Sequence, residues 1–197
     1  MAYRIRQFLL CCVCLLSLWL GMSELTVAQS DTAGLSAFAG VGGSTTFGAL
    51  YERARFGGHG LTGLAIRFAP GNTQAFELAA TAEGAYFFND GESGGDYILA
   101  NGGVEFRLVG NLQQPIHYFL GVGGGVSRVR ERLYRDRTTG QVTDGYIEWG
   151  PYLAPSVGFD FPMSKSLRLF GQFRFMTVYG TRIGTYQYLV FFAGVRL

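Results

Sequence analysis

The sequence predicts an all-β protein: an eight-stranded, closed, antiparallel, up-and-down transmembrane β-barrel. Three observations lead to this fold class. After residue 33, apolar and polar residues alternate with a period of two, which is the period of a β-strand. Eight such stretches occur, and the connections between them are alternately tight and long. Glycines, 30 in all, are interleaved with 17 Phe and 11 Tyr, a mixture that suits strongly curved strands.

The first 28 residues are predicted to be a signal peptide. Arg4 and Arg6 supply a positive segment, an apolar run follows over 8–20, and residues 26–28 (Thr-Val-Ala) match the small-x-small pattern of a cleavage site. A membrane anchor is disfavoured, because polar residues end the run before about 20 apolar positions. We therefore expect one domain, the barrel, over 29–197.

Composition excludes several classes of protein. All three cysteines lie within residues 1–28, so the secreted chain has no disulfide framework or zinc-thiolate site. Without the leader, 14 basic and 13 acidic residues remain, and this balance gives no reason to expect a nucleic-acid partner. Phosphate-binding loops, paired CxxC motifs and HExxH motifs are absent from the sequence. We therefore expect no cofactor, no metal and no catalytic residues.

The eight candidate strands follow one another along the chain. They cover residues 35–43, 60–69, 74–88, 97–109, 116–129, 146–161, 166–179 and 186–197. Three connections are tight, at 70–73, 110–115 and 162–165, and four are longer, at 44–59, 89–96, 130–145 and 180–185. A chain that starts in the periplasm then has every tight turn on the periplasmic side and every long loop outside, which is the pattern of outer-membrane barrels.

The two faces of these strands differ in polarity. One face is apolar and includes Leu64, Ile66, Phe68, Phe76, Leu78, Val104, Phe106, Leu108, Tyr118, Leu120, Val122, Trp149, Leu153, Val157, Phe159, Leu189, Phe191 and Val195. The other face combines charges with glycines. Eight strands enclose a space only wide enough for side chains, so we expect the polar face inside and the apolar face against lipid. The aromatic residues on the apolar face fall at two levels, as in interfacial girdles.

At this point the chain resembles the small eight-stranded outer-membrane β-barrel superfamily, which includes OmpA-like, OmpX-like and porin-family barrel domains. The resemblance covers the whole secreted chain and includes the last strand, 186–197, which alternates up to its end. Members usually end in an aromatic residue, whereas this chain ends in Leu197. The resemblance implies export to the outer membrane and recognition of the last strand by the barrel-assembly machinery. The superfamily is functionally diverse, so it implies no particular activity.

Charged side chains on the polar face are predicted to form a lumen network. Its members are Arg67, Glu77, Glu83, Glu105, Arg107, Glu148, Asp160, Arg168, Arg174 and Arg196. Five basic and five acidic groups balance each other, which favours mutual ion pairs because unpaired buried charge is costly. A proton or ion path is the functional alternative. We favour a plugged interior because eight strands leave no aqueous channel.

A second basic cluster lies at the external end of the fifth and sixth strands. Its members are Arg128, Arg130, Arg132, Arg135 and Arg137. Guanidinium groups suit lipopolysaccharide phosphates, because they donate two hydrogen bonds in a fixed fork. The alternative is a solvated hairpin extension whose charges pair locally. The sequence leaves both readings open.

Two further features carry alternatives. His59 lies in the expected first external loop, where Ser44 or Asp144 are its only candidate catalytic partners, whereas His117 opens a strand at the opposite end. Flanking glycines predict that His59 is poorly held, and hence not catalytic. Pro151 and Pro155 lie inside a strand, where we expect a bulge, with a lateral gap as the alternative.

The sequence thus predicts a non-enzymatic outer-membrane barrel with a plugged polar interior. Its external loops are expected to serve envelope integrity, adhesion or surface-ligand binding. Its expected partners are outer-membrane lipid, lipopolysaccharide and, during biogenesis, the barrel-assembly machinery. A lipid-A-modifying acyltransferase or deacylase is the alternative function, and a narrow channel for small hydrophobic solutes is a third.

Overall fold

The computed structural model describes the barrel and most of its connections. The described residues are 33–51, 54–68, 73–88, 96–132, 134–135, 140, 142–143, 145–164, 166–180 and 184–197. The predicted signal peptide, 1–28, lies outside them. No helix in this part of the chain is long and apolar enough to cross a membrane.

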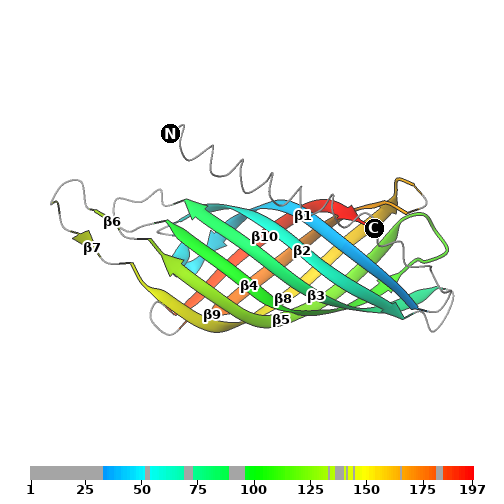
Figure 1. Ribbon diagram of the computed structural model, residues 1–197, viewed down its shortest axis with the longest axis horizontal. Helices are drawn as coiled ribbons and strands as arrows, with labels where there is room; N and C mark the ends of the chain where they lie inside the picture. Colours follow the sequence, from blue (N-terminus) through cyan, green and yellow to red (C-terminus); the bar gives the residue numbers. More distant parts are fainter. Residues whose placement is uncertain are drawn as a thin grey trace. The chain divides into compact units, whose positions relative to one another are not determined.

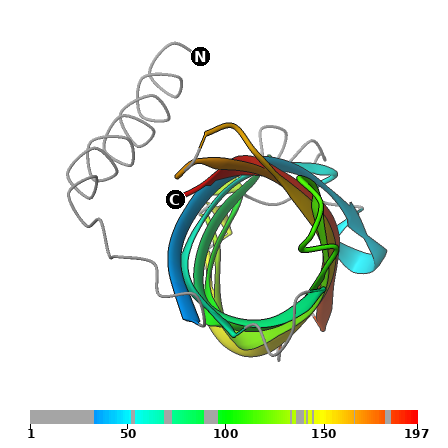
Figure 2. The same cartoon turned by 90° about the vertical axis from the view of Figure 1, so that its right-hand side faces the viewer.

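Eight long strands form a closed antiparallel barrel in the order β1-β10-β9-β8-β5-β4-β3-β2. They are β1 (Ala33–Phe47), β2 (Phe56–Phe68), β3 (Gln74–Phe88), β4 (Tyr97–Gly110), β5 (His117–Glu131), β8 (Ile147–Pro162), β9 (Arg168–Tyr179) and β10 (Thr185–Arg196). They run obliquely to the barrel axis (Figure 1) and form a ring in the end-on view (Figure 2). The fold class predicted from the period-two pattern is therefore confirmed.

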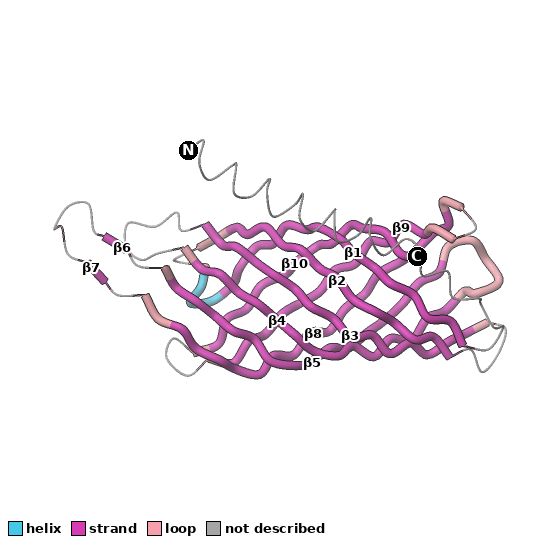
Figure 3. Tube along the Cα trace, viewed as in Figure 1, coloured by secondary structure: helices cyan, strands magenta, loops and turns pink. Residues whose placement is uncertain are grey.

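The two ends of the barrel differ in their connections. At one end, which we call the loop end, β5 and β8 are joined through a small ladder of β6 (Tyr134–Arg135) and β7 (Val142–Thr143). The short 3-10 helix η1 (Gly48–Leu50) lies at the same end (Figure 3). The other end, which we call the turn end, holds the connections β4–β5 and β8–β9 and the last strand residue, Arg196.

The first hairpin differs most from its prediction. We expected a loop over 44–59, but β1 continues to Phe47 and β2 begins at Phe56. The segment Gly57-Gly58-His59-Gly60 is paired with β1, where His59 lies opposite Gly42. A run of glycines resembles a loop in sequence, yet here the backbone is extended, and the absence of a side chain at Gly57 leaves room for the Phe87 ring.

The outward face is apolar, as the alternation predicts. Leu64, Val104, Leu120 and Val157 each expose close to half or more of their surface on this face. Soluble monomers rarely expose contiguous apolar surface on this scale. Many aromatic residues on this face lie toward the ends of the strands, whereas Phe173 and Phe191 contact each other at mid-strand. Phe68, Phe76, Phe106, Tyr118 and Phe159 lie toward the turn end, and Phe47, Phe56, Phe88, Trp149 and Tyr179 toward the loop end.

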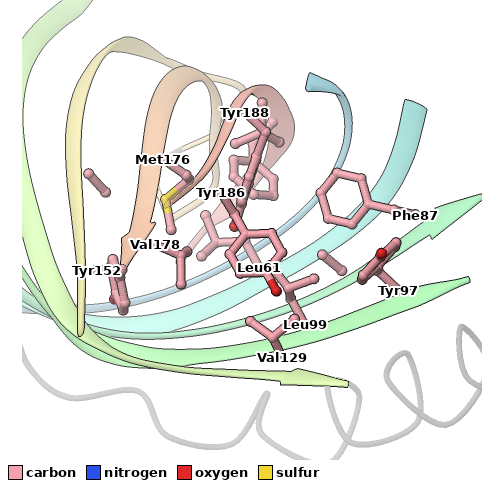
Figure 4. Close-up of a cluster of buried hydrophobic side chains, with 14 of the residues drawn as sticks. Leu61, Phe87, Tyr97, Leu99, Val129, Tyr152, Met176, Val178, Tyr186 and Tyr188 are labelled. Carbon is pink, nitrogen blue, oxygen red and sulfur yellow. The ribbon is translucent and has the colours of Figure 1, made fainter. Parts of the chain in front are cut away.

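The interior is layered, which the sequence pattern did not predict. Charged residues fill its turn half and middle, where they pack against a few aromatic rings. The loop half is mostly apolar and forms a buried cluster (Figure 4) with Leu61, Phe87, Tyr97, Leu99, Val129, Tyr152, Met176, Val178, Tyr186 and Tyr188 among its members. The expected polar interior therefore describes the turn half and middle better than the loop half.

Inward-facing glycines make room for large inward side chains. A Cβ added at Gly63 would lie 2.5 Å from both the Phe38 ring and the Ala80 carbonyl oxygen. By contrast, a Cβ at outward-facing Gly60, on the same strand, would meet nothing within 4 Å. The space over these glycines is thus part of the packed core.

Gly63→Ala is expected to lower the free energy of unfolding by about 1–3 kcal/mol, the usual cost of overpacking. Gly60→Ala, the matched control, adds a methyl group to open surface and should change stability by at most about 0.5 kcal/mol. Urea unfolding of the two variants in detergent micelles measures both values. Equal effects at the two glycines would contradict the inward placement of Gly63.

Pro151 and Pro155 both face outward in β8. Pairing with β5 is unbroken in register along the whole of β8 up to Asp160. Pairing with β9 stops after Leu153 and resumes at Ser156 in the same register. A bulge would shift the register by one residue, so the predicted bulge is wrong. The ladder to β9 lapses because a proline has no N–H to donate.

Candidate functional site

Glu77 is the acceptor for three arginines in the turn half of the lumen. Its carboxylate lies 2.9 Å from Arg107 Nη1, 3.0 Å from Arg67 Nη2 and 2.7 Å from Arg196 Nη1. The guanidinium of Arg107 lies 4.9 Å from the centre of the Phe38 ring, so ring and carboxylate share the cation. One buried carboxylate therefore joins β2, β3, β4 and β10.

Glu105 is the second centre of the network. Its carboxylate accepts hydrogen bonds from Arg107 at 2.9 Å and Arg174 at 2.6 Å. The Ser156 hydroxyl donates to it at 2.6 Å and the Gln172 amide at 2.8 Å. Both carboxylate oxygens are thus occupied by donors from β4, β8 and β9, which is what a buried anion requires.

Asp160 is the third centre and lies nearest the turn end. Its carboxylate accepts a hydrogen bond from Arg168 Nε at 2.5 Å and lies 3.3 Å from His117 Nδ1. Arg67 and Arg196 approach its other oxygen at 3.7 Å. His117 therefore lies at the turn end, as the sequence predicts, and is part of this cluster.

Nine of the ten residues proposed for the lumen network are connected through these contacts. They are Arg67, Glu77, Glu83, Glu105, Arg107, Asp160, Arg168, Arg174 and Arg196. Glu148 lies apart, at the loop end, where the Tyr186 hydroxyl donates to it at 2.5 Å and lies 2.5 Å from the Tyr146 hydroxyl.

His59 is placed differently from its prediction. It is buried in β2, with 6% of its surface exposed, and faces the lumen rather than an external loop. Its Nε2 lies 2.7 Å from Ser44 Oγ, and its Nδ1 lies 2.8 Å from Glu83 Oε1. The expectation of a poorly held loop histidine is therefore wrong. Of the two partners considered, the structure brings Ser44 to His59, and Asp144 lies outside the described residues.

Glu83 is the partner of His59 that sequence reasoning missed. It was assigned to the lumen network but not to the histidine, 24 positions away. Strand parity could have placed both side chains in the lumen, because Arg67 and Glu77 face inward and His59 and Glu83 share their odd numbering on the same strands. Parity does not predict that they touch.

Three side chains of the predicted basic cluster, Arg128, Arg130 and Arg132, are described by the structure. Arg128 and Arg130 point outward from the loop end of β5, and Arg130 and Arg132 are exposed. The Arg128 guanidinium lies 5.9 Å from the Trp149 ring centre, also on the outward face. Only the backbone of Arg135 is described, in β6, and Arg137 lies outside the described residues. The outward arginines thus lie at the level of the loop-end aromatic residues.

Comparison with known proteins places the fold. No protein-family model matches the sequence, and no curated protein is significantly similar to it. Among solved structures, Neisserial surface protein A is similar at a TM-score of 0.61 and 14% identity, over 85% of this chain and 99% of that one. Ail, the attachment invasion locus protein of Yersinia pestis, is similar at 0.52 and 12%, over 85% of this chain and 100% of that one. The chain therefore has the fold of the small eight-stranded outer-membrane β-barrels.

Proposed function

We propose that this chain is an integral outer-membrane protein that acts by binding at its external surface. The observation that carries the proposal is its inverted polarity, with charges paired inside and apolar side chains across the middle of the outward face. A barrel in lipid needs this arrangement, because its outer wall meets hydrocarbon. The loop end is then extracellular and the turn end periplasmic. Envelope integrity, adhesion and capture of a surface ligand are the roles that its loops could serve.

The packed lumen supports a plugged barrel. Arg107, Glu105 and Gln172 fill the middle of the barrel, each with 1% or less of its surface exposed. On their turn-end side Glu77 binds three arginines, and on their loop-end side lies the apolar cluster of the loop half. Both a proton path and a channel for hydrophobic solutes require continuous space or a chain of water, which a close-packed interior of eight strands does not leave.

The direction of His59 argues against chemistry on lipid A. The ring faces the lumen, and the barrel wall separates it from the acyl chains around the protein. The lipid-A-modifying alternative requires a base on the outward face or in an opening of the wall. The lapse in pairing near Pro155 lies between β8 and β9. His59 lies on β2, and strands β10 and β1 stand between β2 and β9.

Lipopolysaccharide is the partner that we assign to the outward arginines. Arg128 and Arg130 lie on the outward face near exposed Trp149, where the interfacial aromatic belt meets the headgroups. Phosphates of the outer leaflet would lie at this level, and arginine binds them with two hydrogen bonds. Recognition of β10 by the barrel-assembly machinery is proposed as well, since its outward residues Leu189, Phe191 and Val195 alternate up to the end of the strand.

Trp149 offers a direct test of this assignment. A chain from residue 29 onward holds no other tryptophan, so its fluorescence reports binding beside Arg128. We expect the double variant Arg128→Gln, Arg130→Gln to bind lipopolysaccharide about tenfold more weakly or worse, a loss of about 1.4 kcal/mol or more. Arg128→Lys should recover only part of this affinity, since lysine does not stack or bind in a bidentate manner.

The control for this experiment is lipid A from which the phosphates have been removed. Wild type and the double variant should bind it equally weakly if the guanidinium groups recognise phosphate. Unchanged affinity of the double variant for intact lipopolysaccharide would overturn the assignment. The alternative, a solvated hairpin with locally paired charges, predicts that outcome.

A further inference from the structure

Ser44, His59 and Glu83 are arranged as a nucleophile, a base and an orienting carboxylate. We propose that they form a serine-nucleophile site for soluble esters of short acyl groups, inside the loop half of the barrel. This activity goes beyond the binding role proposed above. The three side chains come from adjacent strands, β1, β2 and β3, and each residue exposes less than a tenth of its surface.

The hydrogen bonds fix which nitrogen carries the proton. A carboxylate oxygen only accepts, so His59 Nδ1 donates to Glu83 Oε1 across 2.8 Å. The unprotonated Nε2 then accepts the Ser44 hydroxyl proton across 2.7 Å. Arg174 Nη1 donates a hydrogen bond to the other oxygen of Glu83 across 3.3 Å, which holds this carboxylate in place. This tautomer is the one in which histidine acts as a general base toward serine.

Aromatic rings hold the histidine in place. The centres of the Phe87, Tyr188 and Phe192 rings lie 5.3, 5.4 and 5.9 Å from the centre of the His59 ring. Gly57 leaves the space for this packing, because a Cβ there would lie 2.7 Å from the Phe87 ring and 2.9 Å from Ser44 Oγ. A base whose orientation is fixed by packing and by a second hydrogen bond is what catalysis requires.

The reaction balances with water as the only co-reactant. Ser44 Oγ adds to the ester carbonyl carbon while its proton passes to His59 Nε2. The tetrahedral adduct collapses, the carbon–oxygen bond of the ester breaks, and the alkoxide takes this proton and leaves as an alcohol. Water then adds to the acyl-serine with the same base, and collapse releases the carboxylic acid and restores the Ser44 hydroxyl.

Access to Ser44 is from the loop end, and the first loop covers it. Thr46, the next inward residue of β1, donates a hydrogen bond to the Ala54 carbonyl oxygen at 2.6 Å. Leu50 and Ala54 are buried in the apolar cluster of the loop half. A substrate therefore displaces this loop and places its acyl group among apolar side chains. The lumenal position excludes membrane lipids and favours water-soluble esters with a short acyl chain.

A fluorophosphonate probe, which reacts with serines activated by a base, tests the proposal on the full chain folded in detergent. We expect the probe to attach to Ser44, as located by peptide mass spectrometry, and p-nitrophenyl butyrate to slow the labelling. Ser127 is the internal comparison, because it is fully buried in the same lumen and its hydroxyl has no hydrogen-bond partner among the described residues. Labelling of Ser127 at the rate of Ser44, or no labelling of Ser44, would overturn the proposal.

Variants separate the roles of the three groups. His59→Gln should slow labelling of Ser44 at least 100-fold, the scale of general-base catalysis, and Glu83→Gln at least tenfold. Thr46→Val, which frees the Ala54 carbonyl, should speed labelling severalfold, and Ser127→Ala should leave it unchanged. Heat-modifiability on a gel shows which variants fold. A folded His59→Gln or Glu83→Gln protein that labels at the wild-type rate would refute the mechanism.

Ester cleavage at Ser44 can be tested separately from the lipopolysaccharide binding proposed for the outer surface. Ser44→Ala removes the nucleophile on the inner face of β1, whereas the Trp149 signal reports lipopolysaccharide at the outer face of β5 and β8. We expect Ser44→Ala to abolish ester cleavage and keep full lipopolysaccharide binding. Loss of lipopolysaccharide binding in this variant would show instead that Ser44 has a structural role for the whole loop end.

Discussion

Glu77→Gln is expected to lower the free energy of unfolding by about 3–5 kcal/mol, the cost of leaving buried charge without its partner. Glutamine keeps the shape of the side chain but removes the negative charge that Arg67, Arg107 and Arg196 share within 3.0 Å. The side chain of Glu77 is wholly buried, so water does not replace the lost interaction. Urea titration of the folded protein in micelles measures the difference.

A double variant shows whether the lost ion pairs cause the destabilisation expected for Glu77→Gln. Glu77→Gln with Arg196→Gln removes one cation together with the carboxylate, so it should be less destabilised than the sum of the two single changes, by roughly 1 kcal/mol or more. Strict additivity, or a loss below about 1 kcal/mol for Glu77→Gln alone, would show that the charges contribute little to the folded state.

Val122→Arg is expected to cost about 2–4 kcal/mol, the penalty for a guanidinium near the middle of the bilayer. Val122 faces outward with 48% of its surface exposed, between Tyr118 toward the turn end and Arg128 toward the loop end. An arginine at this depth is far from both interfaces, so its charge either remains in hydrocarbon or distorts the lipid around it. Folding into lipid vesicles at increasing urea concentrations measures the cost.

Leu35→Arg is the matched control for this depth. Leu35 also faces outward and is exposed, but it is the third residue of β1 and lies at the turn end. Its guanidinium can reach the interface by extending along the strand, so the expected cost is at most about 1 kcal/mol. Equal costs at the two positions would contradict a membrane centred on Val122.

The sequence predicted the strands and their faces because both follow from a period of two. Once Arg67 and Glu77 were placed inside, every second residue of their strands followed, and the structure agrees. The alternation of tight and long connections predicted which connections lie together at each end of the barrel. The strand limits were accurate wherever a strand ended at a proline or a charged turn, as at Pro162.

The candidate serine site could not be predicted, because it depends on pairing between strands. Ser44 and His59 were assigned to a loop, since three glycines surround the histidine and glycine favours turns. The approach of Glu83 to His59 is diagonal across the β2–β3 ladder, where His59 lies opposite Ala85. One strand's pattern carries no information about the register of the next, so contacts of this kind come only from the structure.

The sequence did not predict the apolar loop half of the lumen, for a different reason. Phe87 and Phe192 face inward between outward residues that are also apolar. Both faces are then hydrophobic, and the period-two signal vanishes. Only the charged residues nearer the turn end mark the inside, so the sequence overestimated how far the polar interior extends.

The three arginines on Glu77 also constrain how the barrel assembles. Arg196 is 119 residues from Glu77 along the chain and belongs to β10, the strand that closes the ring against β1. Until that closure, the Glu77 carboxylate lacks one of its three cations, and the acidic contact left to Arg196 is the longer one, 3.7 Å from Asp160 of β8. Ring closure and charge neutralisation are therefore one event. A contact of such high sequence separation makes folding slow and all-or-none, so chains lacking the last strand should not accumulate as stable seven-stranded intermediates.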